Sequence, residues 1–125
     1  MLPPTPNPAI VEILRSAADR IETDGWLQNS YWNANTGACC ALGALRLASG
    51  YSMTKAHTLE SAHKFMAATE YLKDYLHSTK YSETDANRPP SIATWNDHDS
   101  RVAHDVIELM RSAANKLEEN NDPKI

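Results

Sequence analysis

Residues 37–50 read G-A-C-C-A-L-G-A-L-R-L-A-S-G, and this stretch decides the fold. Between its two end glycines only Arg46 and Ser49 have strongly polar side chains, and the other residues are apolar or very small. A helix that is apolar on every side has to be surrounded by other parts of the protein. We therefore expect a buried central helix over about residues 39–48, with Thr36 as its N-cap.

The N-terminal helix is marked at both of its ends. Asn7 and Pro8 suit the N-cap and the first helical position, and apolar residues then recur at helical spacing over residues 10–21. Gly25 follows, and a glycine with a positive φ commonly ends a helix. We expect residues 1–7 to form an extended, proline-rich arm before this helix.

Two more amphipathic helices are expected in the second half of the chain. Thr58 suits the N-cap of the first, and Asp99 or Ser100 suits the N-cap of the second. The inward face of the first is expected to contain Leu59, Ala62, Phe65, Met66, Thr69, Leu72 and Leu76. The inward face of the second is expected to contain Ala103, Val106, Ile107, Met110, Ala113, Ala114 and Leu117.

The fold class that these patterns predict is all-α. We expect one compact domain over residues 8–119, a bundle of about four helices around the short buried helix, and a loose tail over residues 120–125. A chain of 125 residues with 42% hydrophobic and 22% charged residues is typical of one globular domain. Alternating patterns and β-hairpin turns are not evident.

The first and last helices resemble each other in sequence. Residues 10–22 read I-V-E-I-L-R-S-A-A-D-R-I-E, and residues 106–118 read V-I-E-L-M-R-S-A-A-N-K-L-E. The shared R-S-A-A places two alanines on each apolar face, so we expect these helices to pack on each other or on the central helix. Convergent patterning explains the similarity better than a duplicated half-domain, because the middle of the chain has no matching second half.

The composition excludes several classes of partner and location. The net charge is -4, and no basic stripe for a phosphate backbone occurs, so nucleic acid is not an expected partner. No apolar run approaches the roughly 20 residues of a membrane span, and the N-terminus does not resemble a signal peptide. Cys39 and Cys40 are adjacent and expected to be reduced thiols, which indicates a cytoplasmic protein.

Metal and cofactor sites are not expected. His57 and His63 are separated by the same spacing as His98 and His104, and that spacing does not place two imidazoles on one helix face. Glycine-rich phosphate loops are also missing from the pattern. We therefore predict no metal ligands and no cofactor.

Cys40 is the strongest candidate for catalysis. In the first turn of the expected central helix, the helix dipole and free N–H groups would lower the pKa of its thiol. His98 or His104 would then serve as the base, with Asn96 or Asp97 to orient it. The alternative is that Cys40 is a small buried hydrophobe that lets the helix pack tightly.

The tryptophans and the W-N-D turn are candidates for binding. The residues that could line a ligand pocket or a partner patch are Trp26, Trp32, Trp95, Asn96, Asp97 and Arg101. For the W-N-D turn we favour a structural role, in which Trp95 fills the core while Asp97 caps the turn or pairs with Arg101. Trp32 lies in a loop without periodicity, so we expect its ring to be exposed.

Three motifs together resemble a known family. They are Gly25-Trp26 with Gln28, then C-A-L-G-A-L at residues 40–45, then Trp95-Asn96-Asp97 with Arg101 and an alanine-rich last helix. From about residue 10 to residue 117 the chain resembles a family of short bacterial and bacteriophage proteins of unknown function. The resemblance implies a small cytoplasmic accessory protein, often phage-borne, and it implies no catalytic residues.

Our leading hypothesis for function is a non-enzymatic helical protein that binds another macromolecule, namely a host protein if the gene belongs to a phage. A cysteine-dependent hydrolase or transferase that uses Cys40 is one alternative. A small-ligand binder with a pocket around Trp26, Trp95 and Asn96 is another. The sequence leaves the oligomeric state open.

Overall fold

The computed structural model of the chain describes residues 3–51, 56, 58–79 and 91–121. Within them the chain forms five helices: α1 (Asn7–Asp24), α2 (Ala41–Ala48), α3 (Leu59–His77), α4 (Ile92–Asn96) and α5 (Ala103–Asn121). The described residues contain isolated β-bridges but no strand. The all-α prediction is therefore confirmed, and the short α4 is an additional helix that periodicity did not indicate.

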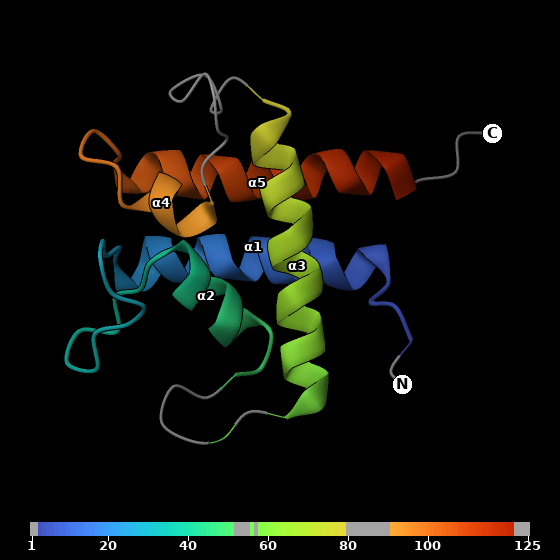
Figure 1. Ribbon diagram of the computed structural model, residues 1–125, viewed down its shortest axis with the longest axis horizontal. Helices are drawn as coiled ribbons and strands as arrows, with labels where there is room; N and C mark the ends of the chain where they lie inside the picture. Colours follow the sequence, from blue (N-terminus) through green and yellow to red (C-terminus); the bar gives the residue numbers. More distant parts are fainter. Residues whose placement is uncertain (1–2, 52–55, 57, 80–90, 122–125) are drawn as a thin grey trace.

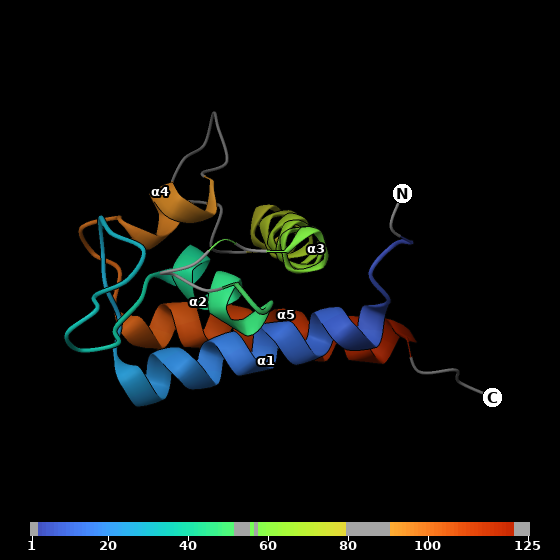
Figure 2. The ribbon, with the colours of Figure 1, turned by 90° about the horizontal axis from the view of Figure 1, so that it is seen from below.

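The helices form two layers. Figure 1 shows α1 and α5 side by side and antiparallel, so that the start of α1 and the end of α5 lie at the same end of the fold. In the same view α3 crosses in front of both. Figure 2 shows α1 and α5 as one layer, with α2, α3 and α4 as the other. The core lies between these layers.

The α1–α5 pair is the most extensive helix contact, as the repeated R-S-A-A sequence predicted. Both alanines of each repeat have no exposed surface, and they are Ala17, Ala18, Ala113 and Ala114. Small side chains on facing surfaces allow two helix axes to approach closely, because no bulky group separates the backbones. Larger residues along the same faces, Leu14 and Met110 among them, are also fully buried.

Helix α2 begins later than the sequence predicted. Cys39 and Cys40 lie before the helix, and Cys40 is its extended N-cap with φ -82° and ψ 179°. Thr36 is not the cap, because its hydroxyl accepts the N–H of Ala38 within the preceding loop at 3.2 Å. The reason is that backbone pairing with an earlier segment keeps both cysteines extended, as described below. The helix contacts α1, α3 and α4.

The predicted inward face of α3 was wrong in part. Thr58 is the N-cap with a capping box, as expected. However, Leu59 and Met66 are 82% and 68% exposed. The buried residues of α3 are Ser61, Ala68, Leu72 and Leu76. The apolar residues of α3 occupy a sector wider than the face in contact, so the crossing direction decides which of them become buried.

The start of α1 also differs from the prediction, whereas its end is confirmed. Pro6 is the residue before α1, and Asn7 is the first helical residue instead of the cap. At the other end Gly25 has a φ of +106°, which confirms its role as the helix terminator. The expected arm includes residues 1–2, which lie outside the described residues.

Helix α5 begins at Ala103, instead of directly after the expected cap at Asp99 or Ser100. Its first turn is closed by Asp105, whose carboxylate accepts the N–H of Val102 at 3.1 Å. Arg101 instead belongs to a separate turn, where its N–H donates to the carbonyl of His98 at 2.9 Å. On the inward face Leu109 is fully buried, although it was not predicted, whereas Ala103 and Ile107 are only half-buried.

The C-terminal part of α5 reaches into the segment expected to be loose. The helix continues to Asn121, and residues 122–125 of that expected tail lie outside the described residues. Among the helices of the described chain, none has both the length and the apolar character that crossing a bilayer requires.

Candidate functional site

The loop between α1 and α2 folds back on itself and sets the position of both cysteines. The N–H of Leu27 donates to the carbonyl of Cys39, and the N–H of Cys39 donates to the carbonyl of Gly25, each at 3.1 Å. Next along the chain, the N–H of Cys40 donates to the carbonyl of Tyr31 at 3.2 Å. These bonds hold both cysteines in an extended segment, so α2 begins only after Cys40, which is its N-cap.

Gly43 lets this loop lie directly on α2. A Cβ atom at Gly43 would overlap the carbonyl oxygen of Tyr31 and would come within 2.9 Å of its carbonyl carbon. The Cβ of Cys39 is also close, at 3.2 Å. A glycine is required here because the obstacle is backbone, which cannot rotate away as a flexible side chain can. The loop and the first turn of α2 therefore form one unit.

Asn96, in the W-N-D motif, joins three segments of the chain. Its side-chain oxygen accepts the indole N–H of Trp26 at 2.8 Å and the backbone N–H of Ala41 at 3.0 Å. Its amide nitrogen donates to the carbonyl of Leu27 at 3.0 Å. The residue is only 1% exposed, so its own amide would lack hydrogen-bond partners without these three groups. Asn96 is thus a structural link between the α1–α2 loop, α2 and α4.

Trp95 and Arg101 lie together beside this link. Trp95 is 1% exposed, and the Arg101 guanidinium is stacked 4.0 Å above the centre of its ring. The Nε of Arg101 also donates to the Trp95 carbonyl at 2.9 Å. The described residues show no ion pair between Arg101 and Asp97. Trp95 is therefore part of the core, and Arg101 covers it through stacking.

Asp97 lies at the edge of the core, in a cleft of about 520 Å³. Its Oδ1 accepts the backbone N–H of Asn29 at 2.8 Å and the side-chain amide of Asn96 at 3.0 Å. The residues that line the cleft are Asn29, Ser30, Tyr31, Cys40, Ala93 and Asp97. The cleft therefore brings Cys40 and Asp97 together, although they are far apart in the sequence.

The chemistry of Cys40 differs from the expectation for a nucleophile. Its Sγ accepts the N–H of Gly43 at 3.3 Å and caps α2 in the way that a serine hydroxyl would. Burial raises the pKa of the Cys40 thiol, and hydrogen bonds from the backbone N–H groups of Gly43 and Leu42 offset only part of that rise. The negative charge of Asp97 raises the pKa further. The predicted lowering of this pKa was therefore wrong, because desolvation outweighs the helix N-terminus.

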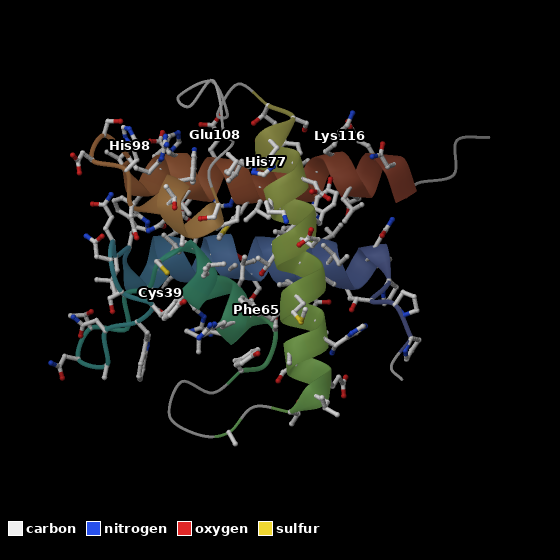
Figure 3. All side chains as sticks on the ribbon, viewed as in Figure 1. Cys39, Phe65, His77, His98, Glu108 and Lys116 are labelled. Carbon is white, nitrogen blue, oxygen red and sulfur yellow. The ribbon has the colours of Figure 1, made fainter. Side chains whose placement is uncertain are left out.

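Neither candidate base bonds to Cys40 within the described chain. His98 is exposed, and its Nδ1 accepts the backbone N–H of Ser100 at 3.1 Å. His104 is 80% exposed, and its Nε2 lies 3.4 Å from a carboxylate oxygen of Glu108. Figure 3 shows His98 on the loop before α5, whereas Cys39 lies beside the start of α2. The structure thus brings Asp97 to Cys40 but not the two histidines.

Tyr31, not Trp32, is the exposed ring of the α1–α2 loop. Tyr31 is 46% exposed at the rim of the cleft, and the Arg46 guanidinium lies 4.2 Å from its ring centre. Trp32 is half-buried against the core and forms a backbone bridge with Cys39. The prediction that the Trp32 ring is exposed was therefore wrong in part, because this ring packs against the core. Which of the two rings is exposed depends on the backbone pairing of Cys39.

Comparison with protein families gives one match, over residues 5–116, to DUF6197, a family of unknown function. The chain belongs to this family. The DUF6197 match includes α1 to α4, most of α5 and every residue that lines the cleft. No curated protein and no solved structure matches the chain significantly.

The DUF6197 chain shows no obvious metal centre in the part that the structure describes. Over those residues, no three side chains among His, Cys, Asp and Glu gather closely enough to hold an ion. Asp97 is also the one carboxylate among the residues that line the cleft. The site is therefore described best as a small, partly polar cleft with an exposed aromatic rim.

Proposed function

We propose that the chain is a non-enzymatic accessory protein that binds another protein through the cleft between residues 29–31 and α4. The observation that carries this proposal is the exposed Tyr31 ring at the rim of a cleft that holds the Asp97 carboxylate. Tyrosine is enriched at protein interfaces because it offers a large, rigid contact surface with a polar tip. The backbone hydrogen bonds of the loop beneath Tyr31 support the proposal, since a surface that is already ordered loses little entropy on binding.

A cysteine-dependent hydrolase or transferase has less support. Because its pKa is raised, the Cys40 thiol ionises less at neutral pH than an exposed cysteine does. A base is also missing, since His98 and His104 bond to other groups in the described part of the chain. For these reasons we assign Cys40 the role of a helix cap at the floor of the cleft.

The setting that we propose is the bacterial cytoplasm, with a host protein as the partner of a phage-borne chain. The two cysteines are buried and free, which is compatible with a reducing compartment. The resemblance to short bacterial and bacteriophage proteins supports the phage origin. An acidic net charge of -4 favours a basic partner over an acidic one.

Affinity capture from a bacterial lysate with matched variants tests this proposal. Tyr31→Ala removes the exposed ring but keeps the backbone carbonyl that receives the Cys40 N–H. Val102→Ala is the control, because Val102 is 54% exposed and does not line the cleft. We expect one protein to be recovered by the wild type and by Val102→Ala, and roughly tenfold less by Tyr31→Ala.

Two outcomes of this capture contradict the proposal. Recovery of the same proteins in equal amounts by all three baits would show that the cleft is not the binding surface. Recovery of nothing above the bare matrix, from lysates of several bacteria, would remove protein binding as the function. Melting curves of the three baits establish that each is folded.

Small-molecule binding is a second candidate, favoured by the size of the cleft. A volume of about 520 Å³ is in the usual range of ligand pockets. Ala93→Leu would narrow the cleft from α4, because Ala93 is one of the residues that line it. A metabolite that raises the melting temperature of the wild type but not of Ala93→Leu would favour this candidate. If no compound in a broad screen stabilises the wild type, the candidate is removed.

A further inference from the structure

We infer that the cleft recognises a basic side chain, a lysine or an arginine on an exposed segment of the partner, with the Asp97 carboxylate as its counter-ion. This inference rests on the proposed function and names the chemistry of the partner.

The Asp97 carboxylate is fixed in place before any partner arrives. Its Oδ1 receives two N–H groups, from the Asn29 backbone at 2.8 Å and from the Asn96 side chain at 3.0 Å. Asn96 is itself held by Trp26 and Leu27. Because these hydrogen bonds already hold the carboxylate in one position, it loses little conformational freedom when it binds a cation.

The other oxygen of Asp97 remains free to accept a bond. Within the described part of the chain no group donates to Oδ2, and no lysine, arginine or histidine forms an ion pair with Asp97. Oδ2 is also not one of the fully buried polar atoms that lack a hydrogen-bond partner, so it is not closed off from the cleft. A preorganised carboxylate with one open oxygen favours an N–H donor that carries a positive charge, because charge-assisted bonds are the stronger ones.

The surroundings of the cleft favour a long basic side chain over other cations. Ser30 and Ala93 line the cleft beside Asp97, and the Tyr31 ring offers an apolar surface at its rim. A lysine or arginine stem can lie along such a surface while its charged end reaches the carboxylate. A metal ion is disfavoured because Asp97 is the one carboxylate in the lining, which includes no histidine.

The Arg46 guanidinium lies against this rim, and it limits the contacts that the Tyr31 ring can make. Its guanidinium already covers one face of Tyr31, with 4.2 Å to the ring centre. It also lies over Tyr51 and Phe65, at 5.7 Å and 5.3 Å, so aromatic rings hold it in position. The partner's cation is therefore drawn by Asp97, and Tyr31 supplies apolar contact instead of a second cation–π interaction.

A random peptide library displayed on a surface and selected on the immobilised full chain tests the inference. The peptides selected on the wild type are expected to share a lysine or an arginine. The best of them, made synthetically, should bind Asp97→Asn roughly tenfold more weakly. Asp97→Asn keeps an oxygen that can accept the N–H of Asn29, so the variant removes charge and little else. Asp99→Asn, an exposed carboxylate outside the cleft lining, is the control and should bind within about twofold of the wild type.

The peptide side of the contact gives a test that does not depend on a variant protein. Replacing the basic residue of the selected peptide by norleucine should weaken binding to the wild type by the same factor, roughly tenfold. It should have little further effect on Asp97→Asn, since the two changes remove one interaction. This arm keeps the inference testable if Asp97→Asn fails to fold.

The outcomes separate this inference from the proposed function. Selected peptides that need Tyr31 but contain no basic residue would contradict recognition of a basic side chain and would leave protein binding in place. Basic peptides that bind the wild type and Asp97→Asn equally would overturn Asp97 as the counter-ion. A library that yields no peptide above background would overturn recognition of a basic segment, whereas the capture experiment alone decides whether a protein is bound.

Discussion

Arg15 on α1 and Arg111 on α5 make equivalent contacts across the interface between their helices. Arg15 binds both carboxylate oxygens of Glu118 at 3.0 Å and the side-chain oxygen of Asn115 at 2.9 Å. Arg111 binds both carboxylate oxygens of Glu22, at 3.3 Å and 3.1 Å, and Asp19 at 2.8 Å. In the aligned sequences of the two helices, Glu22 matches Glu118 and Asp19 matches Asn115. The pair therefore has a local two-fold arrangement.

Removing either arginine should affect stability by a similar and small amount. Arg15→Ala and Arg111→Ala are each expected to lower the melting temperature by a few degrees at most, because exposed ion pairs contribute little. The difference from the wild type should shrink in 1 M salt, which screens these contacts. Thermal melts of the wild type and both variants at low and high salt measure these differences in melting temperature. A loss that is large for one arginine and absent for the other would contradict the symmetric arrangement.

Asn96→Ala should destabilise the fold far more than loss of an exposed asparagine. It leaves the buried Ala41 N–H and the indole N–H of the half-buried Trp26 without their acceptor. Each unsatisfied buried donor costs about 1–3 kcal/mol, so we expect a loss of roughly 2–4 kcal/mol in the free energy of unfolding. Asn35→Ala is the control and should change it by less than about 0.5 kcal/mol. Urea denaturation measures both, and equal values would contradict the role of Asn96.

Gly43→Ala should lower stability even though alanine is the better helix former. At an ordinary helix position this change stabilises by about 0.5–1 kcal/mol. Here the added Cβ meets the backbone of Tyr31, so we expect a loss of about 1–3 kcal/mol through overpacking. The measurement is the sign of the change in the free energy of unfolding between the wild type and Gly43→Ala. A higher melting temperature for Gly43→Ala would mean that the α1–α2 loop does not lie against the helix.

The stability should fall in alkaline solution because of Cys39. Burial raises the pKa of this thiol from 9.0 to about 11. Below pH 9.0 the thiol is protonated in the folded and the unfolded chain, so its contribution is fully present. Between pH 9.0 and about 11 the unfolded chain loses its proton first, and stability falls as the pH rises.

This difference between the pKa of Cys39 in the unfolded and the folded chain corresponds to a loss of roughly 2–3 kcal/mol in the free energy of unfolding across this pH range. Urea denaturation at several pH values measures it, with Cys39→Ala as the comparison because tyrosines ionise in the same range. The wild type should lose more stability than Cys39→Ala as the pH rises. Parallel curves for the two proteins would contradict a protonated, buried Cys39.

The helices that the sequence predicted well are those with strong local signals. Thr58 supplies a capping box, and Gly25 ends α1 with a positive φ. The R-S-A-A repeat predicted that the first and last helices pack closely on each other or on the central helix. Such features depend on residues within a few positions of one another, so a sequence pattern contains most of the physics that determines them.

The candidate site could be predicted only in part, because distant backbone groups assemble it. The W-N-D motif predicted a turn over residues 95–97, whereas Trp95 and Asn96 are the last residues of α4. The motif also did not predict that Asn96 links Trp26 to the start of α2. The cysteines seemed to belong to a helix by composition alone. Pairing with residues 25–31 keeps them extended, which changes both the helix start and the thiol environment.

The sequence by itself therefore determined that this chain is helical, where its long helices lie, and that the alanine-rich faces of the first and last pack closely. Periodic apolar residues and local caps suffice for that, since they act within one helix. Only the tertiary structure decided which side of α3 is buried, where α2 begins, and that Tyr31, Cys40 and Asp97 share one cleft. These depend on hydrogen bonds and packing between segments far apart in the chain, which local pattern does not specify.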